Sequence, residues 1–194
     1  MSSISFRVWF FWCLLHRRFQ VHNLLLLHFT SAAYLLGATG NVQTMTEQIE
    51  LIKLYSTRIL ALAAQMPHVG SLDNPDASAM KRSPLCGSKV AVDVIMQNGK
   101  ITEFAQNVKA CALGQAAASV AAQNIIGRTA EEVARARDEL AAMLKSGGPP
   151  PGPPFDGFEV LAPASEYKNR HASILLSLDA TAEACASIAA QNSA

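Results

Sequence analysis

The sequence predicts an α+β domain in which a small three-stranded antiparallel sheet is covered by helices on one face. Two observations predict it: a β-hairpin signal centred on Asn98-Gly99, and two helical patterns that follow the hairpin directly. Antiparallel sheets commonly bury one face only, so we expect the helices to cover that face. The chain shows no internal repeat, and about half of its residues are apolar, which is enough for a core.

The hairpin is the clearest local signal. Its first strand alternates apolar with other residues at Val90, Val92, Val94 and Met96. Asn98-Gly99 then favours a two-residue type I′ turn, and the chain returns from Ile101 to Val108. Because Ile101 lies on one parity of the return strand and Phe104 on the other, we expect a β-bulge there. A third strand is expected around residues 79–84.

Helices are expected on both sides of the sheet in sequence. A helical pattern starts at Thr46 and reaches Leu62, and a Gly-, Asp- and Pro-rich loop follows over residues 67–79. After the sheet, an Ala-rich helix over residues 113–126 ends at Gly127, and Thr129 to Glu132 form a capping box for a helix to about Lys145.

A Pro-rich insertion separates this helix from the last one. Residues 147–154 read Gly-Gly-Pro-Pro-Pro-Gly-Pro-Pro, which cannot form helix or strand and predicts a stiff, extended surface connection. Docking of a partner on this polyproline run is the alternative interpretation. The last helix is expected from about His171 to Ala190.

The first 44 residues differ from the rest. They hold both Trp, three Arg and no acidic residue, and their apolar stretch from Val8 to Leu15 is too short to span a bilayer. We interpret 1–44 as a non-structural extension or a mis-assigned start before Met45, with a targeting peptide as the alternative. The domain is then 45–194. The formal net charge of the chain is only +1, which argues against a nucleic-acid partner.

Cysteine placement provides the strongest functional signal. Cys86 and Cys111 lie at equal distances from the hairpin turn, so they are expected to lie close together, with the bulge shifting their pairing by one residue. Such a pair could bind a metal or form a disulfide. Four cysteines are too few for a disulfide framework in a chain of 194 residues, so we expect a reducing, cytoplasmic location. Cys185 is interpreted as a packing residue, and Cys13 belongs to the extension.

Three segments together resemble the U-type iron–sulfur cluster scaffold family, which includes IscU, SufU and the N-terminal domain of NifU. They are Ser83-Pro84-Leu85-Cys86-Gly87, the run Cys111-Ala112-Leu113-Gly114 with its small-residue helix, and Arg170-His171-Ala172-Ser173. The Pro-rich insertion resembles the SufU-like branch. The family's third cysteine falls at Ala172 and its aspartate at Ser88, so Cys86, Cys111 and His171 remain of the ligand set that the resemblance implies.

The resemblance implies a non-enzymatic scaffold or carrier that holds iron and a transient [2Fe–2S] cluster. Thiolates and imidazole are suitable donors for it, with an open position left to Ser88, solvent or a second protomer in a homodimer. A cysteine desulfurase would supply sulfur and acceptor apoproteins would take the cluster. The alternatives are a Zn²⁺-binding sulfur acceptor, because two Cys and one His also suit tetrahedral zinc, and a metal-free interaction protein. A cysteine hydrolase has no supporting oxyanion-loop signature.

Overall fold

The structure is a computed structural model that describes residues 56–84 and 86–193. The predicted extension 1–44, with Cys13, and the first part of the predicted helix from Thr46 lie outside the described residues. The described elements, in chain order, are α2 (Thr57–Ala64), β1 (Ala77–Arg82), β2 (Lys89–Gln97), β3 (Lys100–Lys109), α3 (Ala112–Asn124), α4 (Ala130–Ser146), the 3₁₀ helix η1 (Asp156–Glu166) and α5 (Lys168–Asn192).

The sheet is antiparallel throughout, in the order β1-β2-β3, which confirms the predicted α+β class. Asn98 and Gly99 take up positive φ values of 53° and 75°, as the predicted two-residue turn requires. The register of β2 and β3 shifts between Ile95 and Met96, so the predicted bulge is confirmed. It lets Ile101 and Phe104 both enter the core from opposite parities of the strand.

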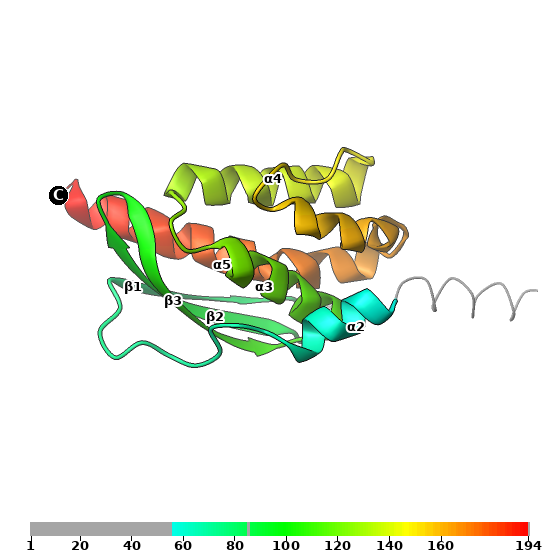
Figure 1. Ribbon diagram of the computed structural model, residues 1–194, viewed down its shortest axis with the longest axis horizontal. Helices are drawn as coiled ribbons and strands as arrows, with labels where there is room; N and C mark the ends of the chain where they lie inside the picture. The colour runs from blue at the N-terminus through cyan, green and yellow to red at the C-terminus, as the bar shows by residue number, and fades with distance from the viewer. Residues whose placement is uncertain (1–55, 85, 194) are drawn as a thin grey trace, which may run out of the picture. The chain divides into compact units, whose positions relative to one another are not determined.

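Helices cover one face of the sheet in two layers (Figure 1). Helix α5 packs on β1 and β2, α3 packs against β3 and α5, and α4 packs on α5 on the side away from the sheet. Helix α3 is buried along most of its length because α2 covers it from another side. Its alanines allow this close packing, since a small side chain lets neighbouring elements approach.

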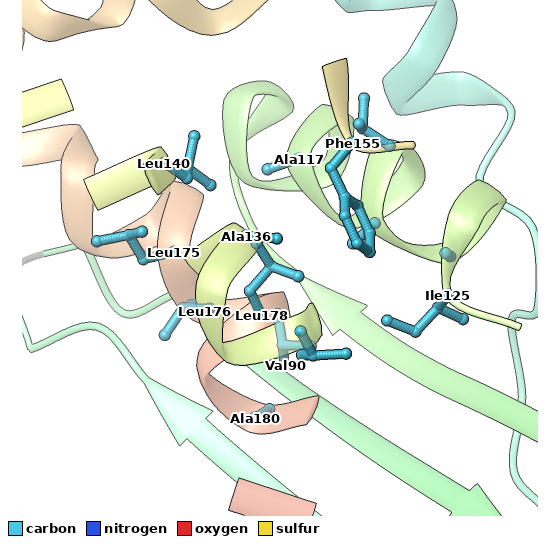
Figure 2. Close-up of a cluster of buried hydrophobic side chains, with 14 of the residues drawn as sticks. Val90, Ala117, Ile125, Ala136, Leu140, Phe155, Leu175, Leu176, Leu178 and Ala180 are labelled. Carbon is cyan, nitrogen blue, oxygen red and sulfur yellow. The ribbon is translucent and has the colours of Figure 1, made fainter. Parts of the chain in front are cut away.

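The core lies between the sheet and these helices. Figure 2 shows side chains from β2, α3, α4 and α5 meeting there, among them Val90, Ala117, Leu140 and Leu178. Helix α5 is long and apolar enough to cross a membrane by length and composition alone, but most of its apolar window is buried in this core. Its hydropathy is therefore explained by packing.

The capping box predicted at the start of α4 is confirmed. Thr129 and Glu132 form the predicted capping box at the start of α4, and Gly147 ends that helix in a left-handed conformation with φ 65°. The Pro-rich stretch from residue 147 to 154 contains neither helix nor strand, as predicted. It is not merely a surface connection, however, because Pro151 is buried and the backbone N–H of Gly152 donates to Glu139 on α4 at 3.2 Å.

Candidate thiol site

The loop between β1 and β2 carries Cys86. Strands β1 and β2 end their pairing at Arg82 and Lys89, and the loop is closed by the backbone N–H of Ser83 donating to the carbonyl of Ser88 at 2.8 Å. Gly87 adopts φ +67°, a conformation that favours glycine. This tight turn holds Cys86 half-buried at the end of the sheet.

Two hydroxyl groups surround the Cys86 sulfur. Its Sγ lies 3.2 Å from Oγ of Ser83 and 3.1 Å from Oγ of Ser88. A thiol can donate to one hydroxyl at a time, whereas a thiolate can accept from both. Burial raises the pKa of Cys86, but hydrogen bonds from Ser83, from the hydroxyl and backbone of Ser88 and from Ser173 outweigh it, lowering the pKa from 9.0 to about 7. A substantial thiolate fraction near neutral pH follows.

Cys111 lies where β3 passes into α3. It is the N-cap residue of α3, with extended backbone angles of φ −66° and ψ 167°, and its side chain makes no capping hydrogen bond. The sulfur is therefore left available, and it lies 3.6 Å from Oγ of Ser173 on α5.

Gly114 allows that contact. A Cβ built on Gly114 would lie 2.6 Å from the Ser173 hydroxyl and 2.8 Å from the Ala110 side chain. The first turn of α3 can therefore press against α5 only because this position has no side chain.

A buried contact between two serines joins the cysteines. The hydroxyl of Ser173 donates to that of Ser88 at 3.1 Å. The side chains thus form a continuous path, Cys86–Ser88–Ser173–Cys111. The two cysteines are gathered at one end of the sheet, as predicted from the hairpin, but both lie outside the paired strands and are free thiols.

His171 is not part of this group. Its buried ring has Nε2 at 3.1 Å from the carbonyl of Ala164 and 3.0 Å from that of Ser165, both in η1. Residues two apart on a helix point about 200° apart, so when Ser173 faces the thiols His171 faces away. Within residues 56–84 and 86–193, no three Cys, His, Asp or Glu side chains come together as a metal site, so the predicted set of Cys86, Cys111 and His171 is not assembled in this conformation.

The sequence alone does not show the contacts of the two serines. Motif spacing places Ser173 two residues after His171 and Ser88 at the position of an aspartate, but it predicts no contact between Ser173 and a thiol. The signal that could have indicated Ser173 is the helical period. Of the residues in Arg170-His171-Ala172-Ser173, only one on the inward face of α5 can reach the sheet. Cys185 is buried in the core, and burial raises its pKa to about 11, which fits the predicted packing role.

The family model described as the NifU-like N-terminal domain matches residues 54–170. A crystal structure of the N-terminal part of a nitrogen-fixing NifU-like protein from Brucella abortus is 46% identical, with a TM-score of 0.72, covering 73% of this chain and 99% of that chain. Among curated proteins, no sequence matches this chain.

A second solved structure shares the fold. It is a putative iron–sulfur cluster assembly scaffold protein for the SUF system from Fervidobacterium islandicum AW-1, with a TM-score of 0.62. It is 20% identical and covers 69% of this chain and 98% of that chain. At that identity the likeness concerns the fold alone.

Proposed function

The chain belongs to the NifU-like N-terminal domain family, and from this premise we propose that it is a scaffold or carrier in iron–sulfur cluster assembly. The observation that carries the proposal is the pair of half-buried free thiols, Cys86 and Cys111, joined through two buried serine hydroxyls. In this role the cluster is cargo and the protein performs no catalysis of its own.

Cys86 and Cys111 are the ligands in this proposal. Iron–sulfide cores are held by soft thiolates, and a thiol with a pKa near 7 ionises at little cost at neutral pH. The hydroxyls of Ser88 and Ser173 can turn to donate to sulfur, which stabilises the charged form that binds iron.

The two thiols are half of the four-ligand set with which a [2Fe–2S] cluster is typically held. A second copy of the chain in a homodimer would supply the other two thiols. His171 stays a predicted third ligand, and it would require the ring to leave the carbonyls of Ala164 and Ser165. An incomplete set within one chain suits a carrier, because the cluster is released when a better ligand set is offered.

The source of sulfur in this proposal is a cysteine desulfurase, and acceptor apoproteins receive the cluster. The lowered pKa of Cys86 also favours a second candidate, a sulfur acceptor that takes persulfide sulfur on Cys86 and holds Zn²⁺. A cytoplasmic location accords with free thiols. That residues 1–44 form a non-structural extension stays a prediction.

The test is metal and acid-labile sulfide analysis of the full chain purified without oxygen, with a visible absorption spectrum. Cys86→Ala and Cys111→Ala are the variants, and Cys185→Ala, in the core, is the matched control. Equal iron and sulfide, lost in the first two variants and kept in the control, would support the scaffold. Zinc alone would favour the sulfur acceptor. An absence of metal in the wild type would overturn both and leave an interaction protein.

A further inference from the structure

Three cations stand side by side at the thiol end of the sheet. Arg82 on β1 pairs with Lys89 on β2, and Lys89 pairs with Lys109 on β3. Directly paired residues of antiparallel strands project to the same face, so the three side chains form one row across the sheet. We call Arg82, Lys89 and Lys109 the cation row.

The row lies on the face that the helices leave open. The neighbouring strand position Val90 is buried in the core and Val108 packs against that core, and successive strand residues alternate between faces. The row therefore projects to the sheet face opposite the one that Figure 1 shows covered by α3 and α5. Arg82 and Lys109 are exposed and Lys89 is half-buried.

The fold does not neutralise these charges. Within the described part of the chain, the ion pairs involve Lys81, Arg128 and Arg137, and no carboxylate pairs with the row. Like charges directly opposite each other destabilise a sheet, so the arrangement costs stability without a compensating internal contact. By contrast, Asp93 on the same face accepts hydrogen bonds from the Leu72 backbone and the Ser78 hydroxyl.

The surroundings of the row resemble those of a protein interface. Met80 occupies the next outward position on β1 and is 58% exposed. Exposed methionine beside arginine is typical of protein–protein contact surfaces. The chain as a whole carries only +1, so a local row of three charges suits an acidic protein surface better than the long charged backbone of a nucleic acid.

The row is also next to the site chemistry. Arg82 and Lys89 flank the loop that holds Cys86, and Lys109 precedes Cys111 by two residues. We propose that the cation row, with Met80, is the docking surface for a carboxylate-rich face of the protein that delivers sulfur to the thiols. This inference rests on the proposed function, because it assigns the row to the sulfur-donating partner.

The test measures the affinity of the full-length chain for the cysteine desulfurase of the same organism, at about 50 mM and about 300 mM salt. The variant is R82Q/K89Q/K109Q. The matched control, K100Q/R135Q/K145Q, removes three exposed cations elsewhere that also lack ion pairs within the described residues. We expect the row variant to bind about tenfold more weakly at low salt, with the difference shrinking at high salt, and the control to change by less than about twofold.

Three results would overturn the docking proposal: no binding by the wild type, equal weakening in the control, or binding by the row variant at the wild-type level. Thermal unfolding distinguishes a loss of docking from misfolding of the variant. Because the substitutions remove like-charge repulsion, the Tm of the row variant should be unchanged or higher. If the row variant instead lost affinity only for a short DNA duplex, a nucleic acid would replace the protein partner. Reconstitution of the wild type with ferrous iron and sulfide needs no protein partner, so its failure would overturn the proposed function separately.

Discussion

The hydroxyl groups of Ser88 and Ser173 lie 3.1 Å apart, although the two residues are 85 positions apart in the chain. Both are buried, and each also contacts one of the two site cysteines. The contact therefore fixes the loop after β1 against α5. It also places both thiols next to the same pair of hydroxyl groups. A buried hydroxyl without a hydrogen-bond partner costs free energy. The pair therefore also favours the one position of α5 in which Ser173 meets Ser88.

This contact predicts how the reactivity of Cys86 depends on pH. The pKa of Cys86 is lowered to about 7 because hydrogen bonds, including those from Ser88 and Ser173, outweigh the effect of burial. Ser88→Ala should raise this pKa more than Ser173→Ala, since Ser88 touches the sulfur directly. If the pKa rises to about 8, the thiolate fraction at pH 7 falls about fivefold.

The measurement is the rate of iodoacetamide labelling of the Cys86 peptide against pH, followed by mass spectrometry. The wild type should reach half its maximal rate near pH 7. Ser187→Ala, on the exposed side of α5, is the control and should leave the profile unchanged. A profile that is the same in Ser88→Ala as in the wild type would contradict the role given to the hydroxyls.

Gly114 yields a prediction about packing between α3 and α5. In Gly114→Ala the new methyl group would lie 2.6 Å from the Ser173 hydroxyl, so the helices must separate or the serine must turn. Overpacking of this kind costs about 1–3 kcal/mol of the free energy of unfolding. Urea unfolding measures it, with Gly152→Ala as the control because a Cβ there meets nothing within 4 Å. Equal stability of the two variants would show that the helices yield easily.

The sheet and the helices could be predicted because local signals agree with the fold. Asn98-Gly99 specifies its turn through positive φ angles, and Thr129 with Glu132 specifies the start of α4 through its own hydrogen bonds. The bulge was visible as a change of parity between Ile101 and Phe104. Each of these signals involves residues close together in sequence, so no tertiary information was needed.

The site was predicted only in part, because its details depend on how distant segments pack. The nearness of Cys86 and Cys111 followed from hairpin symmetry, but the Ser88–Ser173 contact depends on the docking of α5. The orientation of His171 depends on η1, a 3₁₀ helix that was not predicted and that contains Pro163. The spacing of the motif identified His171 as a candidate, but it could not predict the direction in which the imidazole ring points.

The capping box at the start of α4 yields a stability prediction. Thr129 accepts from the backbone N–H of Glu132 at 3.3 Å, and Glu132 accepts from that of Thr129 at 2.9 Å. Thr129→Ala should therefore cost about 1 kcal/mol of the free energy of unfolding. Thermal or urea unfolding measures it beside Ser187→Ala, for which we expect a change within about 0.5 kcal/mol. A neutral Thr129→Ala variant would mean that tertiary packing alone specifies the start of α4.

His171 provides the sharpest distinction between a structural and a ligand role. Its Nε2 lies within hydrogen-bonding distance of the carbonyls of Ala164 and Ser165, so His171→Ala removes a buried ring and its hydrogen bonds, although the Ala164 carbonyl still accepts from the Tyr167 backbone N–H at 3.0 Å. We expect this variant to lose about 1–3 kcal/mol of the free energy of unfolding. His171→Gln, whose amide can still donate, should recover part of that loss. Both are measured by urea unfolding of protein freed of metal with a chelator.

Metal content then separates the two roles. A structural histidine changes stability but not the iron or zinc bound per folded molecule, because the proposed ligands Cys86 and Cys111 remain. If His171 turns to bind the cargo, both variants should bind less metal after reconstitution, and His171→Gln should not recover it, since a neutral amide is a poor substitute for imidazole at soft or borderline metals. The conformation in which Nε2 faces η1 favours the structural outcome, so we expect metal content to be retained in the folded fraction.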